Sequence, residues 1–370
     1  MKEIVILGAG KIGRMVSHLL SSTAEYRLRL GDSDPANLEQ ASRGLANLSA
    51  IPTDFASAAD LDRILQGAAA VVSCAPYTCN ALIAARAREK RAHYFDLTED
   101  VRVTRQIQEL AVGAQSAFMP QCGLAPGFIA IAGMHVARGF ADLHELKLRV
   151  GALPRRPGNQ LQYNLTWSTH GLVNEYCNPC DALIDGKAAT TEPLEGLEKL
   201  TLQGVVYEAF NTSGGLGTLA QTLAGKVRNL NYKTIRYPGH NQLMRFLLHE
   251  LRFREHKDEL VRILDRAIPH TLEDEVVVHV SATGTAAMTD GNAGPERGRL
   301  VERTYTQVIP DRTIAGQRWG AIQVTTAAGV SAVVDLLLQG RLPQSGFVRQ
   351  EQVEMREFLA NRFGSYYAAN

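Results

Sequence analysis

A glycine motif close to the first residue constrains this chain more than any other feature. Residues 4–7, IVIL, are typical of a short β-strand, Gly8-x-Gly10-x-x-Gly13 follows directly, and apolar residues then recur at helical spacing. In a strand–turn–helix unit, such glycines permit a tight turn and let the backbone approach a pyrophosphate. Backbone N–H groups at the helix start then face the phosphates. The sequence therefore predicts a dinucleotide site formed by Gly8, Gly10, Lys11, Ile12 and Gly13.

A carboxylate after the second expected strand indicates which dinucleotide binds. This strand runs from Tyr26 to Leu30 and leads into Gly31-Asp32-Ser33-Asp34. Asp32 follows Gly13 by about 20 residues, a spacing at which a carboxylate accepts hydrogen bonds from the adenosine ribose. A 2′-phosphate would meet two carboxylates here and no adjacent arginine. We therefore predict NAD rather than NADP, with Asp32 and Ser33 among the cofactor-binding residues.

The pattern of strands and helices continues to about residue 120. An apolar run at 69–75 is followed by an expected helix at 79–90, a strand at 93–97, a helix at 101–114 and a strand at 116–120. Alternation of this kind indicates a parallel, doubly wound α/β sheet of the Rossmann type. Ala75 and Pro76 follow one of these strands, at the edge where open α/β sheets bind ligands, so we expect them at the cofactor.

The texture of the sequence changes after Gln121. A nearly apolar helix is expected to end near 137, and alternating runs at 145–150, 161–167, 275–280 and 300–309 are typical of strands. Helices near 241–250 and 257–267 are expected to cover one face of that sheet. A last helix, after Thr326 and ending near 338, should return to the first domain. We therefore predict an NAD-binding domain from residues 1–122 and 321–370, with an inserted α+β substrate domain from 123–320.

Composition narrows the class of ligand. The net charge is +1 and basic residues are spread along the chain, so we expect neither nucleic acid nor a membrane as partner. Without an 18-residue apolar run or a leader-like start, a cytoplasmic location is expected. Five cysteines suit free thiols in a reducing compartment. Cys177 and Cys180 have C-x-x-C spacing but no second such pair, so we expect no metal site.

Four motifs resemble one family of enzymes. The strings EAFNTSGG at 208–215 and YKTIRYPGH at 232–240 are long and unusual, while GLAPG at 123–127 and the pair Tyr163-Asn164 are shorter. Together with the glycine motif they resemble the saccharopine dehydrogenase-like oxidoreductases, and within that family the lysine 6-dehydrogenases. The resemblance implies a dinucleotide-dependent enzyme whose inserted domain also forms a homodimer interface. Saccharopine reductases tend to have Asp where this chain has Ala125, which argues against saccharopine as the substrate.

Oxidation of a side-chain amine requires a proton acceptor, because hydride leaves the carbon only when the nitrogen lone pair is free. An ammonium group of pKa about 10.4 must therefore lose a proton first. Asp96, at a strand end beside the expected nicotinamide site, is the first candidate. His240, with an ordinary pKa near 6.5, and Cys122 at the domain junction are the alternatives. Each also has a plain structural interpretation, as a turn residue, a hydrogen bonder or a core thiol.

The string YKTIRYPGH contains the candidate anchor for a substrate carboxylate. The guanidinium of Arg236 binds a carboxylate through two N–H groups, and flanking tyrosines are expected to form an apolar wall. Thr212 and Ser213 could add donors, and Tyr163 and Asn164 are expected to line the same cavity. The alternative interpretation of this string is a basic turn at a dimer surface.

Three functions remain open from the sequence. The first is NAD-dependent oxidation of an amino-acid side-chain amine, foremost the ε-amine of L-lysine, to an aldehyde that cyclises to a piperideine carboxylate. The second is a saccharopine- or opine-type dehydrogenase, whose substrate needs a second cationic site from Arg303 or Arg245. The third is a protein that senses NAD without turnover, which a pocket without carboxylate or histidine near the nicotinamide would favour.

Overall fold

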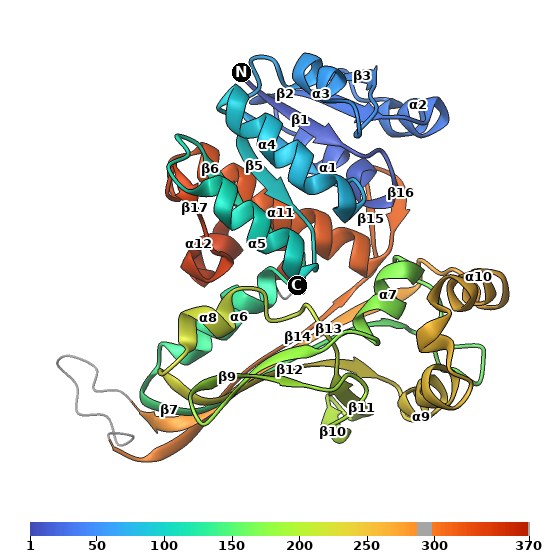
Figure 1. Cartoon of the computed structure of the whole chain (residues 1–370), viewed down its shortest axis with the longest axis vertical. Coiled ribbons are helices and arrows are strands. Elements are labelled where there is room, and N and C mark those ends of the chain that lie inside the picture. The colour runs from blue at the N-terminus through green and yellow to red at the C-terminus, as the bar shows by residue number, and fades with distance from the viewer. Residues whose placement is uncertain (287–297, 369–370) are drawn as a thin grey trace. The chain divides into compact units, whose positions relative to one another are not determined.

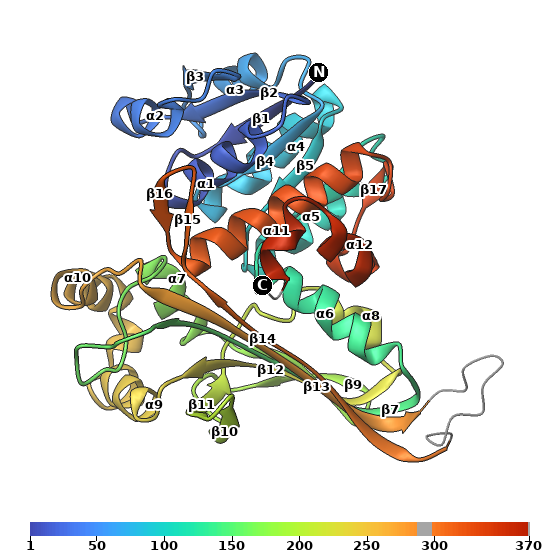
Figure 2. The same cartoon turned by 180° about the vertical axis from the view of Figure 1, so that it is seen from behind.

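The fold is described from a computed structural model that covers residues 1–286 and 298–368 (Figures 1 and 2). The chain divides into two compact units, which are described separately. The first unit comprises Met1–Phe128 and Gln323–Ala368, and the second comprises Ile129–Ile322. Residues 123–128, expected at the start of the second domain, belong to the first unit, whereas Ala321 and Ile322 belong to the second.

The first unit contains a seven-stranded sheet in the order β17-β6-β5-β4-β1-β2-β3. Every neighbouring pair is parallel, and the strand order reverses at β1, so the predicted doubly wound Rossmann sheet is confirmed. Its strands are β1 (Lys2–Leu7), β2 (Tyr26–Asp32), β3 (Leu48–Pro52), β4 (Ala70–Ser73), β5 (His93–Asp96), β6 (Ala117–Met119) and β17 (Gly346–Phe347). The sequence did not indicate β3 or β17, which are the two edge strands.

Helices between and after these strands add to the apolar core of the first unit. They are α1 (Lys11–Ser21), α2 (Pro35–Ser42), α3 (Ala58–Leu65), α4 (Asn80–Lys90), α5 (Val101–Ala111) and α12 (Met355–Ala360), with short 3-10 turns at η1 (Tyr77–Cys79), η4 (Gln350–Gln352) and η5 (Gly364–Tyr367). Asp34, Ser57 and Asp100 cap the starts of α2, α3 and α5 through their side chains. Side-chain capping of this kind satisfies N–H groups that the helix itself leaves free.

Helix α11 (Ala321–Leu338) begins earlier than expected, at Ala321 rather than after Thr326. Among the described residues it is the one helix long and apolar enough to cross a membrane, and 89% of its apolar window is buried inside the protein. Its early turns are closely packed, because a Cβ on Gly329 would lie 2.9 Å from the carbonyl oxygens of Cys122 and Gly123. Such burial is typical of a core helix.

The second unit contains a mixed sheet in the order β10-β11-β12-β7-β13-β14, with β8 and β9 paired beside β12. Its strands are β7 (Phe140–Pro154), β8 (Cys180–Ile184), β9 (Lys187–Thr191), β10 (Glu198–Leu202), β11 (Val205–Asn211), β12 (Val227–Arg236), β13 (Asp274–Ala286) and β14 (Leu300–Pro310), followed by the hairpin β15 (Arg312–Ile314) and β16 (Gln317–Trp319). Only β12 and β7 run parallel among the pairs described in this unit.

The strand predicted at 161–167 is wrong. This segment is a loop with one isolated bridge, between Leu165 and His270. Its apolar residues alternate because Leu161, Tyr163 and Leu165 all enter the core of the second unit. The alternation of apolar residues in this segment therefore reflects their burial in the core and not pairing in a strand.

Helices of the second unit lie in two places. They are α6 (Phe128–Ala137), α7 (Thr169–Glu175), α8 (Leu219–Leu223), α9 (His240–Arg245) and α10 (Lys257–Ala267), with η2 (Phe246–Glu250) and η3 (Phe253–Glu255) between the last two. The predicted helices near 241–250 and 257–267 form, but α9 and α10 group with α7 at one end of the sheet (Figure 1). It is α6 that lies on the sheet, since Gly133 approaches Leu148 of β7 closely.

Candidate functional site

The glycine turn after β1 is closely packed at Gly8 and Gly13 and open at Gly10. Gly8 has a φ of 102°, and a Cβ there would lie 2.6 Å from the carbonyl oxygen of Cys74. A Cβ on Gly13 would lie 1.7 Å from the carbonyl oxygen of Gly8, whereas one on Gly10 would meet nothing within 4 Å. Gly8 and Gly13 are therefore required by internal packing, and Gly10 leaves the backbone open to a ligand.

Helix α1 begins at this open side without a side-chain cap. Gly10 is its N-cap residue, Lys11 is exposed, and Ile12 is half-buried. N–H groups in the first turn of a helix have no partner within the helix and favour an anion. The residues present thus fit the pyrophosphate of a dinucleotide, as the sequence predicted.

Asp32 is fixed between β2 and the glycine turn. Its carboxylate is 8% exposed and accepts hydrogen bonds from the backbone N–H of Ala9 at 2.6 Å and of Asp34 at 2.9 Å. Each carboxylate oxygen accepts more than one hydrogen bond, so these contacts leave capacity for ribose hydroxyls. Ser33 and Asp34 are exposed at the same edge.

Ala75 and Pro76 lie beside the glycine turn, as expected of residues that follow β4. A Cβ on Gly8 would lie 3.0 Å from the backbone nitrogen of Ala75. Ala75 is half-buried and Pro76 is exposed. The predicted cofactor-binding residues therefore come together at the carboxyl edge of the parallel sheet.

Asp96 is enclosed by residues of its own unit. Its side chain has no exposed surface, and Oδ1 accepts hydrogen bonds from the backbone N–H of Thr98 at 3.1 Å and of Gln121 at 2.9 Å. Oδ2 accepts from the hydroxyl of Tyr94 at 2.8 Å and from Asn80 at 3.4 Å. Burial raises the pKa of Asp96 to about 6. Its carboxylate joins the ends of neighbouring strands, which accounts for its position without a catalytic role.

Cys122 is a core thiol. Its Sγ is buried, donates to the carbonyl of Met119 at 2.8 Å and accepts from Gln350 at 3.1 Å. Burial, with the nearby negative charge of Asp96, raises the pKa of this thiol well above its usual range. A thiol held neutral in this way is a poor proton acceptor.

His240 is also unsuited to the predicted role of base. It is fully buried at the start of α9, with Nδ1 2.8 Å from the carbonyl of Leu161 and Nε2 3.1 Å from the hydroxyl of Tyr176. Because a carbonyl only accepts, Nδ1 carries the hydrogen and Nε2 accepts from Tyr176. Burial and the charge of Arg236 lower the pKa of His240 to about 3, rather than the expected 6.5. The imidazole is therefore neutral across the physiological range.

Arg236 lies at the end of β12, inside a cage of aromatic side chains. Its side chain is 2% exposed, and its Cζ lies 5.2 Å from the ring centre of Tyr163 and 5.9 Å from that of Tyr176. Nε donates to the hydroxyl of Tyr176 at 2.9 Å, and Nη1 donates to the carbonyl of Ile235 at 2.8 Å. Across the described part of the chain, no carboxylate lies within 4.0 Å of this guanidinium. We call Arg236, Tyr163, Tyr176, His240 and Phe210 the arginine cage.

A second buried arginine in the same sheet has its own partner. Arg149 of β7 is 1% exposed, and its guanidinium forms a two-pronged pair with Glu198, including a hydrogen bond of 3.3 Å from Nη2. Lys233 pairs with the same carboxylate at 2.7 Å. Buried charges are normally compensated in this way. Arg236 has no such direct pair in the described part of the protein, and the negative charge of the buried Glu175 acts on it only from a greater distance.

The string YKTIRYPGH is a strand and a helix start rather than a basic turn. Residues 232–236 end β12, and His240 begins α9. Alternation along β12 divides its side chains between two faces. Tyr237 stacks on Tyr207 at 5.7 Å in a separate apolar cluster, so the prediction that it flanks the anchor is wrong.

Only one of the other predicted substrate residues belongs to the arginine cage. Tyr163 forms part of the cage, whereas the side chain of Asn164 accepts from Asn159 at 3.2 Å and stabilises the loop. Thr212 follows β11, and its buried hydroxyl has no hydrogen-bond partner within the described structure. Ser213 is buried and donates its backbone N–H to the carbonyl of Glu175 at 3.1 Å.

Two cage residues were not singled out from the sequence. Phe210 stands in EAFNTSGG, two residues after Glu208, and strand alternation there could have identified it. Tyr176 contacts Arg236 across 60 positions of the chain, and no local pattern marks it. Its position depends on how α7 packs against β12.

The candidate residues for a second cationic site are already engaged. Arg245 pairs with Glu195 on the surface. Arg303 of β14 lies over the ring of Phe140, with 5.4 Å between its Cζ and the ring centre, at the start of β7. Arg236 lies near the other end of β7, two residues after Thr234, which pairs with Val150. Neither arginine therefore lies in the arginine cage.

The C-x-x-C pair shows no redox or metal arrangement. Cys177 and Cys180 are buried free thiols, and burial raises the pKa of both, that of Cys180 to about 12. Within the described ranges, no group of three or more metal-ligating side chains is found.

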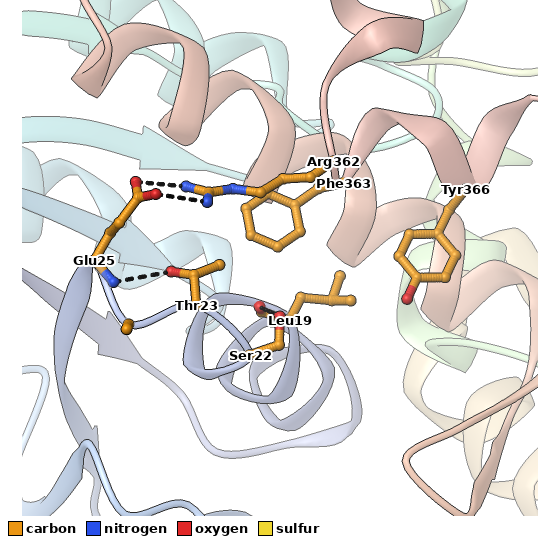
Figure 3. A pocket seen from close by; sticks show the side chains of 8 residues that line it. Leu19, Ser22, Thr23, Glu25, Arg362, Phe363 and Tyr366 are labelled. Atoms are coloured by element: carbon orange, nitrogen blue, oxygen red, sulfur yellow. Dashed lines mark hydrogen bonds and ion pairs between the residues drawn. The ribbon is translucent and has the colours of Figure 1, made fainter.

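Two cavities have linings that include no predicted catalytic or cofactor-binding residue, although Arg245 lines the second. One of about 330 Å³ in the first unit is lined by Leu19, Ser22, Thr23, Ala24, Glu25, Arg362, Phe363 and Tyr366 (Figure 3). Arg362 binds Glu25 there through two bonds of 3.0 and 2.9 Å and also binds Asp335, so its charge is compensated. The other, of about 470 Å³, is lined by Leu197, Asn241, Gln242, Arg245, Phe246, His249 and Glu250.

Comparison with known proteins identifies relatives for both parts of the chain. Residues 4–118 match the family model described as saccharopine dehydrogenase NADP binding domain, and residues 123–364 match that of the saccharopine dehydrogenase C-terminal domain. A saccharopine dehydrogenase (NADP(+), L-glutamate-forming) from Pyricularia oryzae is 22% identical over 336 residues, which are 86% of this chain and 71% of the relative. The enzyme of the same name from Saccharomyces cerevisiae is 23% identical over 51% of this chain and 44% of its own.

A solved structure extends the comparison to the whole fold. Apo saccharopine dehydrogenase (L-Glu forming) from Saccharomyces cerevisiae superposes with a TM-score of 0.79 at 17% identity, over 97% of each chain. This likeness confirms the predicted fold class of a Rossmann domain with a second mixed-sheet domain.

Proposed function

Because this chain belongs to the saccharopine dehydrogenase family, we propose that it is a dehydrogenase that oxidises a carbon–nitrogen bond of an amino acid, foremost the ε-amine of L-lysine. A bound nicotinamide dinucleotide would supply the hydride acceptor. The glycine turn, the start of α1 and Asp32 would hold that cofactor in the first unit. In the second unit, the arginine cage would hold the substrate carboxylate.

The observation that carries this proposal is the buried charge of Arg236. A guanidinium has five N–H donors, and Arg236 uses Nε and one N–H of Nη1 within the protein. The remaining donors, at the end of the group, match the two oxygens of a carboxylate. Aromatic faces stabilise the cation without neutralising it. Glu175 acts on Arg236 only from beyond direct pairing distance, and a carboxylate ligand would add a direct pair of the kind that Glu198 forms with Arg149.

A substrate with one carboxylate suits this arrangement better than one with several. Arg245 and Arg303, which a saccharopine-type substrate would need, lie outside the cage. Ala125, in place of the acidic residue of saccharopine reductases, points the same way. The second candidate is a saccharopine-type oxidation, which the names of the relatives favour.

We propose NAD as the preferred cofactor, although the names of the relatives specify NADP(+). The support is the pair Asp32 and Asp34 at the end of β2, where a 2′-phosphate would meet two negative charges. We also propose that the protein acts as a homodimer, which sedimentation would test.

A substrate panel tests the proposal. L-lysine, saccharopine and cadaverine, which lacks a carboxylate, are each assayed with NAD and NADP by absorbance of the reduced cofactor. We expect turnover of L-lysine with the higher kcat/KM for NAD. Binding of NAD without turnover of any amine would instead identify a sensing protein, and turnover of saccharopine alone would favour the second candidate.

Substitution of the anchor sharpens this test. Arg236→Ala should raise the KM for L-lysine by more than about tenfold, because loss of a buried charged pair costs roughly 2–5 kcal/mol. It should change the KM for cadaverine much less. Arg228→Ala is the control, since it removes an exposed arginine that pairs with Asp142 at 2.9 Å. Equal effects on lysine and cadaverine would place the carboxylate site elsewhere.

A further inference from the structure

The proposed oxidation needs a group that takes a proton from the substrate ammonium, and the three predicted bases do not suit that role. Asp96 is fully buried with four hydrogen bonds to its own unit. Cys122 is a neutral core thiol, and His240 is a neutral imidazole enclosed by Tyr176 and Leu161. A different residue at the carboxyl edge of the parallel sheet would therefore have to accept the proton.

We propose that Glu99, in the loop between β5 and α5, is the general base that removes this proton. The inference rests on the proposed function and adds a catalytic residue to it. Glu99 lies just before α5, where Asp100 is the capping residue.

The loop around Glu99 is held by its other polar side chains. The carboxylate of Asp96 accepts from the backbone N–H of Thr98 at 3.1 Å. The hydroxyl of Thr98 accepts from the backbone N–H of Asp100 at 3.1 Å. Asp100 in turn accepts from Val103 at 2.8 Å. Each of these side chains serves the backbone, so the position of Glu99 is fixed before a ligand binds.

The carboxylate of Glu99 has no such structural role. Apart from its own backbone N–H, it has no hydrogen-bond or ion-pair partner in the part of the chain that the structure describes. Its side chain is half-buried and in contact with solvent. Asp34 and Asp54, other carboxylates in loops after strands of this sheet, both accept from backbone N–H groups at 2.8 and 2.9 Å. Of these three carboxylates, Glu99 is thus the one that accepts from no other residue among those described.

The strand order places Glu99 on the nicotinamide side of the cofactor site. In a doubly wound sheet the dinucleotide crosses the strand-order reversal, with its adenosine at the end of β2 and its pyrophosphate at the turn after β1. The nicotinamide half therefore lies toward β4 and β5, on the other side of β1. Glu99 follows the end of β5, whose Asp96 is paired with Ser73 of β4.

The proton and electron balance of the step is simple. The carboxylate of Glu99 accepts one proton from R–CH2–NH3⁺, which leaves R–CH2–NH2 and a neutral carboxylic acid. A bound dinucleotide would accept hydride from the carbon, and water would hydrolyse the resulting iminium to the aldehyde and ammonium. Glu99 returns its proton to solvent, with which its side chain is in contact.

The electrostatic surroundings suit a proton acceptor. Burial raises the pKa of Glu99, and the negative charges of Asp100 and Asp96 raise it further. These two acidic groups are the charges that face it among the described residues. A base whose pKa is raised toward the working pH accepts a proton more readily from an ammonium group.

Matched variants of two glutamates test the proposal. Glu99→Gln and Glu109→Gln each remove one negative charge by the same substitution, and Glu109 is exposed on α5. Glu99→Gln should lower kcat for L-lysine by about 100-fold or more, while calorimetry shows an unchanged Kd for the dinucleotide. Its deficit should shrink as the pH rises toward the pKa of the free amine. Glu109→Gln should retain kcat within about twofold, on the ground that surface charge changes are small.

The outcomes distinguish failure of the proposed base from failure of the proposed function. If the wild type oxidises amines and Glu99→Gln keeps its kcat and pH profile, Glu99 is not the base. An equal loss in both variants would also overturn the proposal, since it would reflect charge alone. If the wild type oxidises no amine, the proposed function fails and the base with it. Glu99→Asp, which keeps the carboxylate, should recover part of the activity, and thermal melting would verify that each variant folds.

Discussion

His240, Tyr176 and Arg236 of the arginine cage form a chain of hydrogen bonds in which the donor and the acceptor of each bond are fixed. The carbonyl of Leu161 accepts from Nδ1 of His240, so Nε2 of that imidazole accepts from the hydroxyl of Tyr176. The oxygen of Tyr176 is then free to accept from Nε of Arg236. A histidine with a pKa lowered to about 3 thus orients the guanidinium without adding a second charge. Tyr176 and His240 are therefore positioning residues for the proposed anchor.

Removal of the Tyr176 hydroxyl tests this chain at the scale of one atom. Tyr176→Phe should raise the KM for L-lysine about tenfold or more with little change in kcat, because a hydrogen bond to a charged group contributes roughly 1.5–3 kcal/mol. Tyr207→Phe is the matched control, since its hydroxyl lies 3.4 Å from Glu275 in a separate cluster. An unchanged KM in Tyr176→Phe would show that Arg236 does not need this orientation.

Asp96 gives a prediction for stability against pH. Its folded pKa is raised to about 6 from the ordinary 3.8, so the folded state binds more protons than the unfolded state between these values. The contribution of this carboxyl to stability is therefore largest below pH 4 and falls as the pH rises through 6. Asp96→Asn keeps an oxygen to accept from Thr98 and Gln121. Relative to the wild type, the variant should gain up to about 2 kcal/mol in unfolding free energy between pH 4 and 7, measured by urea denaturation. A constant difference across that range would contradict the raised pKa.

At the scale of elements, local patterns predicted the first unit better than the second. The strand–glycine–helix pattern and regular alternation of elements gave the parallel sheet, since each βα unit is encoded in contiguous residues. In the second unit, residues 161–167 alternate because they enter an apolar core, and the predicted strand is absent. Arg236 was predicted as the carboxylate anchor from its place in a cationic, aromatic string. The burial of Asp96, Cys122 and His240, which makes them unsuitable as bases, depends on distant segments and could not be seen.

The glycine turn offers a matched pair of substitutions within one element. Gly13→Ala places a methyl group 1.7 Å from the carbonyl oxygen of Gly8 and should lower the unfolding free energy by roughly 1–3 kcal/mol. Gly10→Ala meets nothing within 4 Å and should retain stability. It should instead weaken dinucleotide binding, because this glycine lets the backbone approach the pyrophosphate. Denaturation and calorimetry on both variants measure the two effects. Wild-type dinucleotide affinity in Gly10→Ala would contradict this placement.

At the scale of the whole molecule, the first unit is closed by residues from both ends of the sequence. Strand β17 pairs with β6, and the backbone N–H of Val348 donates to the carbonyl of Phe118 at 2.9 Å. Arg362 binds Glu25 (Figure 3) and also binds Asp335. Asp335 has no exposed surface, so loss of its arginine would leave a buried charge uncompensated. The cofactor unit therefore depends on residues more than two hundred positions away.

Removal of the final segment tests this dependence. A chain ending at Gly340 lacks β17 and Arg362, and it should lose cooperative unfolding of the first unit and dinucleotide binding together. Arg341→Ala is the control, because it breaks only an exposed pair with Glu357 and should cost about 1 kcal/mol or less. Full dinucleotide affinity in the shortened chain would show that the last segment is dispensable.

The position of β17 also bears on how the protein is made. A ribosome releases the chain from its N-terminus, and contiguous domains fold as they emerge. Here β1 to β6 emerge early, but their edge partner and the buried α11 are synthesised only after the entire second unit. Throughout that interval the edge of β6 is unpaired, and exposed strand edges promote association between chains. Nascent copies should therefore require chaperone protection during synthesis of residues 129–338, and production at low temperature or with added chaperones should raise the soluble yield.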